Sequence, residues 1–213
     1  MEPPSRVTMA AMATGPRLYD TLLEPLVRGF REAGVDLVGP QSGMRVLDVG
    51  CGTGTHLALY AARGCAVAGV DLNQGMLDRA AGRLGPGAIL LEADATELPF
   101  DDDAFDLAIT MTVLHELAPE DRLAALGEMS RVAGRVLVID HHPEPDGSLR
   151  GKVIRGFSTG IERIAGGDHY RNYREFVASG GLPNLAGQAG LVVTRSTREG
   201  SGSMGVYLLA PRR

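Results

Sequence analysis

The pattern of apolar and polar positions along this chain predicts strands that alternate with helices. Short apolar runs, most of them rich in β-branched residues, occupy residues 44–50, 65–73, 88–94, 105–114 and 135–142. Helix-forming segments lie between them, at residues 55–64, 75–84 and 119–132. Near-continuous apolar strands separated by helices indicate a parallel sheet that is covered on both faces.

The two ends of the chain extend this pattern differently. Within residues 16–33, leucine and phenylalanine side chains recur every four positions, which predicts an amphipathic helix with a break near Pro25. Residues 190–198 and 203–210 are strand-like and are joined by the sequence EGSG. We expect them to form a hairpin, so the last strand should run antiparallel to the rest of the sheet.

The length of 213 residues suits a single domain. Residues 143–181 interrupt the alternation with prolines, glycines and only weak helical character, which is typical of an inserted lid. The predicted fold is a doubly wound α/β domain with a mostly parallel seven-stranded sheet and an antiparallel C-terminal hairpin. Its expected parts are an N-terminal helical segment, a core, a lid, and a helix turn with the hairpin, at residues 1–43, 44–142, 143–181 and 182–213.

Composition and charge narrow the class of protein. With 44% hydrophobic and 22% charged residues, the chain resembles folded rather than disordered proteins. The net charge of −5 disfavours nucleic-acid binding, which usually needs an excess of basic residues. Cys51 and Cys65 are the only cysteines, which argues against a disulfide framework. No run approaches the ~18 apolar residues of a membrane span, and residues 1–15 lack a secretion signal, so we expect a cytoplasmic location.

The sequence VLDVGCGTG, residues 46–54, marks the expected ligand site. Its glycines follow the first strand, and glycine permits backbone angles and close ligand approach that a side chain would prevent. Parallel α/β sheets bind ligands at the carboxyl ends of their strands, where the strand order reverses. Asp71 ends the second strand, 21 residues after Gly50, where a carboxylate can accept hydrogen bonds from two ribose hydroxyls. The pattern therefore indicates a ligand that contains a ribose.

A nicotinamide cofactor also contains ribose and would share these features. The glycine spacing therefore has to show whether the ligand is a nicotinamide cofactor or another ribose-containing molecule. The dinucleotide fingerprint G-x-G-x-x-G, counted from Gly50, requires a small residue where this chain has Thr55. Counted from Gly52, the same fingerprint meets Leu57. Neither count fits, which disfavours an NAD-dependent oxidoreductase.

Together these segments resemble the class I S-adenosylmethionine-dependent methyltransferases, in the branch that includes ubiquinone and menaquinone biosynthesis enzymes. VLDVGCGTG is similar to the first motif of that family, and VDLN is similar to its acidic second-strand motif. EADATELPFDDDAFDLAI is similar to the stretch that joins the family's adenine contact to the fourth strand. The resemblance covers residues 44–142 and implies S-adenosyl-L-methionine as cofactor, but it says little about the acceptor.

The resemblance also implies which residues bind the cofactor. Gly50 and Gly52 would line its methionine portion, Asp71 would hold the ribose, and Met111 would contribute backbone near the sulfonium. Asp48 would support the glycine loop from within the first strand rather than contact the cofactor. The implied cofactor site comprises Tyr19, Gly50, Cys51, Gly52, Gly54, Asp71, Leu72, Met76, Asp94, Ala95 and Met111.

Several of these positions have two interpretations. Asp94 and the backbone of Ala95 would meet the adenine, since a carboxylate accepts a hydrogen bond and an amide donates one. Leu72 and Met76 would cover the faces of the adenine, or they pack within the protein. Tyr19 would reach the cofactor carboxylate, or it packs its own helix.

Methyl transfer from a sulfonium needs the acceptor held in line and water excluded, without a covalent enzyme intermediate. A hydroxyl acceptor also needs a base, whereas a thiolate or free amine does not. The candidate catalytic residues are His115, after the fourth strand, and His141 and His142, after the fifth; ordinary loop histidines are the alternative. Only Glu116 offers an acidic ligand after the fourth strand, so we expect no metal site.

The lid carries the remaining signal about the acceptor. Residues 149–165 combine an apolar helical face with basic residues elsewhere, which favours a simple cap and a soluble small-molecule acceptor. Contact with an anionic membrane that delivers a lipid or quinone-like acceptor is the alternative. Residues 169–176, HYRNYREF, could bind an acidic acceptor or a cofactor carboxylate, or be simply exposed. A non-catalytic protein that binds the cofactor is the second functional class, and the sequence does not indicate an oligomeric state.

Overall fold

The structure is a computed structural model that describes residues 16–144 and 167–212, with Gly147, Gly156, Thr159, Gly160 and Arg163 between them. For residues 16–26 and Gly167 it describes the backbone alone. The side chain of Tyr19 and most of the expected lid helix at 149–165 therefore lie outside the described residues.

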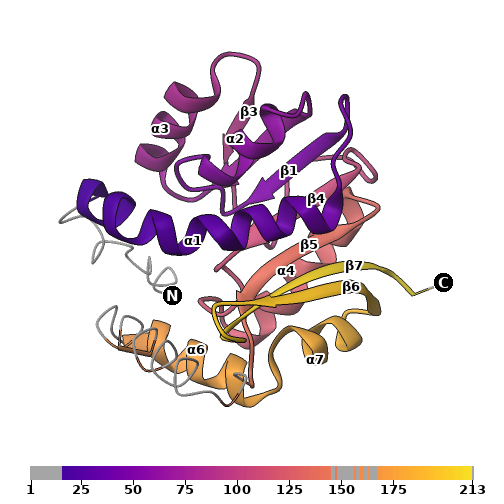
Figure 1. The fold of residues 1–213 in the computed structure, drawn as a ribbon. Coiled ribbons are helices and arrows are strands. Elements are labelled where there is room, and N and C mark those ends of the chain that lie inside the picture. Colours follow the sequence, from indigo (N-terminus) through magenta and orange to yellow (C-terminus); the bar gives the residue numbers. More distant parts are fainter. Residues whose placement is uncertain are drawn as a thin grey trace, which may run out of the picture.

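A seven-stranded sheet forms the centre of the molecule (Figure 1), with the strand order β3-β2-β1-β4-β5-β7-β6. The first five strands run parallel, and β7 pairs antiparallel with both β5 and β6. This arrangement confirms the predicted fold class, including the antiparallel hairpin. The strands are β1 (Arg45–Val49), β2 (Ala66–Asp71), β3 (Ile89–Glu92), β4 (Leu107–Met111), β5 (Val136–His141), β6 (Leu191–Glu199) and β7 (Met204–Pro211).

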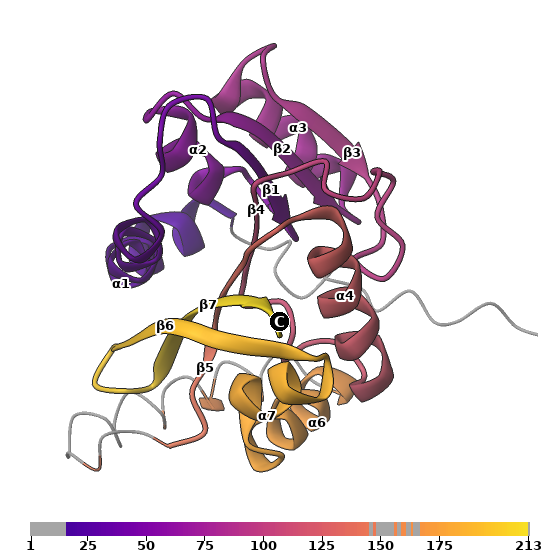
Figure 2. The same cartoon turned by 90° about the vertical axis from the view of Figure 1, so that its right-hand side faces the viewer.

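Helices cover both faces of the sheet (Figures 1 and 2). One apolar cluster contains Leu57 and Tyr60 of α2 and Leu77 of α3, and the other contains Met129 of α4 and Leu182 of α7. The central strands β1, β2, β4 and β5 are buried between these two layers, which explains their continuous apolar sequences, whereas the edge strands β3 and β6 are partly exposed. The described helices are α1 (Pro16–Val38), α2 (Thr55–Ala61), α3 (Gln74–Leu84), α4 (Pro119–Val132), α6 (Gly167–Ala178) and α7 (Gly181–Gln188).

The expected break of the N-terminal helix near Pro25 was wrong. Helix α1 runs without interruption from Pro16 to Val38. Proline removes one backbone hydrogen bond from a helix, but tertiary packing can hold the chain helical on either side of it. Here the second half of α1 buries Phe30, Val35 and Val38 in the core.

The strand order reverses between β1 and β4. From β1 the chain proceeds outward to β2 and β3, and it then returns to place β4 on the other side of β1. From β1 the chain continues toward one edge of the sheet and from β4 toward the other, so a crevice forms at the carboxyl ends of these two strands. The segment after β5 also leaves the sheet at this end, so the segments after β1, β4 and β5 all lie around the crevice.

None of the helices in the described part of the structure is both long and apolar enough to span a bilayer.

Two isoleucines test how far the core depends on the centre of the sheet. Ile109 in β4 is completely buried, whereas Ile89 in the edge strand β3 is 56% exposed. We expect Ile109→Ala to lower the free energy of unfolding by roughly 2–4 kcal/mol, because it leaves a cavity in the packed core. The matched change Ile89→Ala should cost less than about 1 kcal/mol. Urea unfolding measures both, and equal costs would contradict this account of the core.

Candidate functional site

A cavity of about 390 Å³ lies at the reversal of strand order, between the loops that follow β1 and β4. It is lined at one end by α1 and at the other by the segment after β3. Of the predicted cofactor residues, those that line it are Gly50, Cys51, Gly52, Asp71, Leu72, Met76, Asp94, Ala95 and Met111. Gly54 lies behind the loop instead, where a Cβ atom would meet Ala80 at 3.1 Å.

The glycine loop takes a backbone conformation that other residues rarely adopt. Gly50, Gly52 and Gly54 have φ angles of 75°, 52° and 71°. A Cβ atom on Gly50 would lie 2.4 Å from Cγ2 of Val113, in the loop after β4, so only glycine lets the two loops approach this closely. Arg83 of α3 ties the far side of the glycine loop by donating to the Thr53 and Thr55 hydroxyls at 2.9 Å.

Asp71 is buried at the end of β2 and organises the loop beside it. Its Oδ2 accepts a hydrogen bond from the Gly52 amide at 2.8 Å, and its Oδ1 accepts one from the Asn73 amide at 2.9 Å. A carboxylate oxygen can accept more than one hydrogen bond. The two oxygens are thus fixed in position and can each still accept a bond from a neighbouring hydroxyl of a ligand.

Leu72 and Asp94 lie at the outer end of the cavity. The Leu72 side chain is 66% exposed although it lines the cavity, so core packing does not explain it. Asp94 accepts two hydrogen bonds from Thr96, both on Oδ1, from the amide at 2.8 Å and from the hydroxyl at 2.7 Å. These bonds fix the carboxylate, and its Oδ2 has no described hydrogen bond. An apolar side chain and an oriented acceptor suit a flat ring that carries an amine.

The inner end of the cavity holds ionisable groups that the sequence did not single out as ligand contacts. Asp48, His56 and Arg31 all line the cavity. Burial, and then the charge of Asp71, raise the pKa of Asp48 to about 8, and Arg31 opposes this shift. Burial and the charge of Arg31 lower the pKa of His56 to about 3, and neither ring nitrogen has a hydrogen-bond partner among the described residues. A guanidinium beside a carboxyl group can receive a ligand that carries both a carboxylate and an ammonium.

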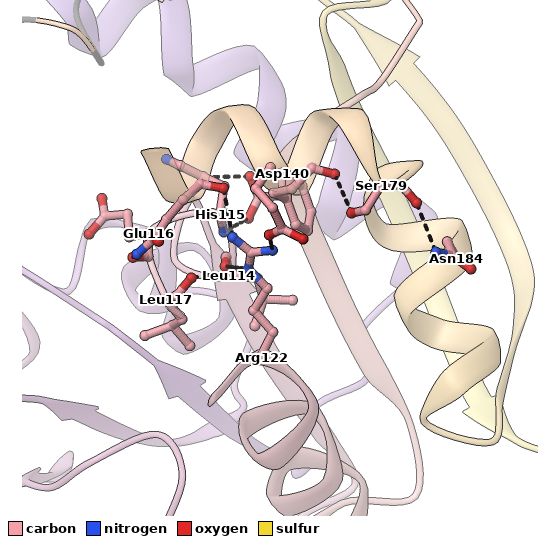
Figure 3. A network of polar contacts seen from close by, with 11 residues as sticks. Leu114, His115, Glu116, Leu117, Arg122, Asp140, Ser179 and Asn184 are labelled. Atoms are coloured by element: carbon pink, nitrogen blue, oxygen red, sulfur yellow. Dashed lines mark hydrogen bonds and ion pairs between the residues drawn. The ribbon is translucent and has the colours of Figure 1, made fainter. Parts of the chain in front are cut away.

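A second polar centre lies beside the cavity, where β4 and β5 end (Figure 3). His115 and Asp140 are both buried, and Nδ1 of His115 lies 2.6 Å from Oδ1 of Asp140. Asp140 also accepts hydrogen bonds from the backbone amides of His115, at 3.3 Å, and His141, at 2.7 Å. Burial alone would raise the pKa of Asp140, but the charge and hydrogen bond of His115, with the neighbouring His141, hold it below its ordinary value. A negative carboxylate therefore orients the imidazole of His115.

Of the three histidines named as catalytic candidates, His115 and His141 lie together and His142 lies apart. The ring of His141 lies 4.7 Å from that of His115 and 4.8 Å from that of Tyr173. His142 faces elsewhere: its ring stacks on Tyr207, and its Nδ1 lies 2.8 Å from the Glu144 carbonyl oxygen. None of the three is among the described residues that line the cavity, whereas the adjacent Glu116 is.

Helix α6 packs against this centre from the segment after β5. The ring of His169 lies 5.7 Å from that of His115, and the ring of Tyr173 lies 5.9 Å from it. Asn172 donates a hydrogen bond to the Glu116 carbonyl oxygen at 2.8 Å.

A buried arginine of α4 fixes α6 in this position. Arg122 donates to the Leu114 and Leu117 carbonyl oxygens at 3.1 Å, forms an ion pair with Glu175 of α6, and donates to the Asn172 carbonyl oxygen. Arg122 is almost completely buried, so losing these partners would leave an uncompensated charge. The last part of the expected lid is therefore a helix docked on the loop after β4.

Sequence reasoning missed Asp140, Arg31 and His56 as members of the site. A signal for Asp140 was present, because a lone carboxylate ends the otherwise apolar strand VLVIDHH. His56 is likewise a polar residue at the start of an apolar helix. For Arg31 no local signal exists, because only the packing of α1 against α2 and against β5, β6 and β7 brings it to the cavity.

Comparisons with known proteins agree with this geometry. The model of a methyltransferase domain matches residues 46–135. A demethylmenaquinone methyltransferase of Thermobifida fusca is 31% identical over 185 residues, which are 80% of this chain and 78% of the relative. Another from Clavibacter sepedonicus is 34% identical over 139 residues, which are 64% of this chain and 55% of the relative.

A solved structure shows the same fold. The magnesium protoporphyrin IX methyltransferase of Synechocystis PCC 6803, which holds bound SAH, superposes with a TM-score of 0.60 at 19% identity, covering 89% of this chain and 83% of that one. The chain belongs to the class I S-adenosylmethionine-dependent methyltransferases, in the branch of the ubiquinone and menaquinone biosynthesis enzymes. It spans about half the length of several curated relatives that it matches.

The raised pKa of Asp48 predicts that cofactor binding releases a proton. With a pKa of about 8, Asp48 is mostly protonated at pH 7. A ligand with a positive charge in the cavity should lower this pKa and expel the proton, and the release should fade above about pH 9, where the group is already ionised.

Calorimetry with S-adenosylmethionine in two buffers of different ionisation enthalpy measures this release. Asp48→Asn should abolish the difference between the buffers, whereas Asp36→Asn, at an exposed site on α1 away from the cavity, should preserve it. Identical binding heats for the unaltered protein in both buffers would exclude a protonated Asp48.

Proposed function

We propose that this chain transfers a methyl group from S-adenosylmethionine to a small-molecule acceptor by direct in-line displacement. One observation carries the proposal: the cavity at the strand reversal is lined by the glycine loop, Asp71 and Asp94, and the buried His115–Asp140 pair lies beside it. The first group suits an adenosyl ligand, and the second suits chemistry on an acceptor.

The cofactor would lie along the cavity with its adenosine at the outer end. Asp71 would accept hydrogen bonds from the two ribose hydroxyls, and Asp94 with the Ala95 amide would bind the adenine. Arg31 would pair with the methionine carboxylate and Asp48 with the ammonium. This orientation brings the sulfonium toward Met111 and the end of β4, the side of the cavity where Glu116 and His115 lie.

The reaction makes one bond and breaks one. An electron pair of the acceptor attacks the methyl carbon, while the bond between that carbon and sulfur breaks and its electron pair returns to sulfur. A hydroxyl or a ring carbon that accepts the methyl group also loses a proton. The sulfonium already activates the methyl group, so the displacement needs no metal acting on that group. His115, oriented by Asp140, would assist loss of the acceptor's proton.

The relatives suggest which acceptor to examine first. Both relatives described above carry the name demethylmenaquinone methyltransferase. This favours a quinone-like acceptor, which the sequence left as the alternative to a soluble one. We therefore propose a small aromatic acceptor of this kind rather than a nucleic acid. On α6, the half-buried ring of Tyr170 stacks at 6.5 Å on the buried ring of Tyr173 and offers aromatic surface near the histidines.

Cofactor affinity should depend on Asp71. We expect Asp71→Ala to weaken binding of S-adenosylhomocysteine by roughly 1.5–3 kcal/mol, about tenfold or more, because two ribose hydrogen bonds are lost. Asp71→Asn should weaken binding less, since the asparagine side chain retains one oxygen that can accept the hydrogen bond from the Gly52 amide. Asp78→Ala, on the exposed face of α3, is the control.

Calorimetry with S-adenosylhomocysteine and with NADH tests the cofactor assignment directly. Unchanged affinity in a folded Asp71→Ala protein would remove Asp71 from the site. Tight binding of NADH without binding of either adenosyl ligand would show that the assignment of cofactor is wrong.

His115 should affect turnover more than cofactor affinity, because it lies beside the cavity rather than in its wall. We expect His115→Ala to lower the rate of methyl transfer by about 10²-fold or more, with little change in S-adenosylhomocysteine binding. His142→Ala should have a far smaller effect, since that ring faces Tyr207.

Transfer of labelled methyl to a panel of reduced naphthoquinones and small phenols measures the rate. Unaltered transfer by His115→Ala to an accepted substrate would exclude its role. Tight cofactor binding without transfer to any member of the panel would favour a non-catalytic protein instead.

A further inference from the structure

Metal-ligating side chains gather where β4 and β5 end. The chain has only five histidines, and three of them, His115, His141 and His169, meet at this point. Glu116 and Asp140 add two carboxylates. One oriented histidine would be enough to assist loss of a proton. Proton transfer by His115 therefore does not explain why two more histidines and a second carboxylate lie beside it.

Two sets of three side chains overlap at His115. One set is His115, Glu116 and His169, and the other is His115, Asp140 and His141. Within each set, the atoms that could ligate a metal lie within 4.8 Å of one another.

The hydrogen bonds of Asp140 decide between these two sets. Asp140 is completely buried and already accepts bonds from the His115 ring and from the His115 and His141 amides. Glu116 and His169 are only half-buried, and Glu116 lines the cavity, so an ion from solvent can reach them. The accessible set is therefore the one that contains Glu116 and His169.

We propose that His115, Glu116 and His169 bind a divalent first-row transition-metal ion of the Zn²⁺ type at the wall of the cavity. Imidazole and carboxylate ligands suit such ions better than they suit Mg²⁺ or Ca²⁺, which prefer oxygen alone. Three protein ligands are typical of ions that keep one coordination position for water or substrate.

Asp140 is positioned to accept a hydrogen bond from a metal-binding histidine without binding the metal itself. Histidines that bind metals usually donate their other ring N–H to a carboxylate, which fixes the ring and makes the ligating nitrogen more basic. Asp140 lies 2.6 Å from Nδ1 of His115, so Nε2 is the nitrogen that would ligate. This carboxylate is a positioning residue and does not itself reach the ion.

The backbone around the three ligands is already tied together. Asn172, three residues after His169 on α6, donates to the Glu116 carbonyl oxygen at 2.8 Å. Bonds of about 2.0 Å to a tetrahedral ion place ligand atoms roughly 3.3 Å apart. The present separations, up to 4.8 Å, therefore require a contraction of about 1.5 Å or less, which rotation of the Glu116 side chain and of the half-buried His169 can supply.

The role of the ion rests on the proposed function, although its binding does not. An acceptor oxygen bound to the ion would have a lowered pKa, so its proton would leave to water before the methyl group is transferred. The ion is neither oxidised nor reduced in this step. His115 would then assist proton loss through the ion that it helps to hold. The proposal departs from the expectation of no metal, which considered only acidic ligands after the fourth strand and so did not include His169.

Metal binding to the full chain tests the proposal without any acceptor. The protein is stripped with a chelator, dialysed against Zn²⁺ or Co²⁺ and analysed for bound metal, and the visible absorption of Co²⁺ reports its ligands. We expect one tightly held ion per chain. His169→Gln and Glu116→Gln should weaken Co²⁺ binding at least tenfold, and Asp140→Asn about tenfold, as other outer-partner changes do.

Control variants separate this site from other histidines and from loss of folding. His142→Ala should bind Co²⁺ like the unaltered chain, because that ring bonds to Glu144. His169→Gln alters a half-buried helix residue, and its urea unfolding should match that of the unaltered chain.

Three results would overturn the proposal. The first is no bound metal at ~100 µM ion, and the second is Co²⁺ binding unchanged in His169→Gln and Glu116→Gln. Loss of binding in His141→Ala alone would also overturn it, since the ion would then occupy the inner set. S-adenosylhomocysteine binding, measured on the same stripped protein, reports separately on the proposed function.

Discussion

The site depends on one close approach, between the loop after β1 and the loop after β4. These strands are neighbours in the sheet, but the chain makes two further strands before it returns to β4. Gly50 permits the contact because it has a positive φ and no Cβ atom to meet Val113. Any larger residue would separate the loops, and the cavity between them would lose its shape. The fold and the ligand site thus share one steric constraint.

Buried carboxyl groups lie at or near the carboxyl ends of β1, β2 and β5, and their surroundings differ. Asp71 is held by two backbone amides, and Asp140 is held by an imidazole and two amides. Asp48 has a raised pKa because burial and the charge of Asp71 disfavour its ionised form. A ligand with a sulfonium and an ammonium supplies the missing positive charge, which suits the cofactor of this family. The parallel strands bring these groups to one edge, where their charges interact.

The second polar centre is assembled from segments that are distant in the sequence. The buried Arg122 of α4 binds the half-exposed Glu175 of α6, and this ion pair holds α6 against the loop after β4. His169 thereby comes beside His115, although neither residue is informative alone. Methyl transfer requires an acceptor to be held near the cofactor, and α6 lies against the loop after β4, whose Glu116 lines the cavity.

The sequence by itself determined the order of strands and helices, the glycine loop and the acidic end of β2, because each depends on neighbours within a few residues. Its periodicity predicted the sheet, and most of the cofactor residues that its motifs predicted line the cavity. Only the tertiary structure decided that Arg31 and His56 face the cavity, that Asp140 pairs with His115, and that His142 turns toward Tyr207. It also decided that α1 continues through Pro25. These outcomes depend on packing between distant segments, and local patterns do not encode which side chains such packing brings together.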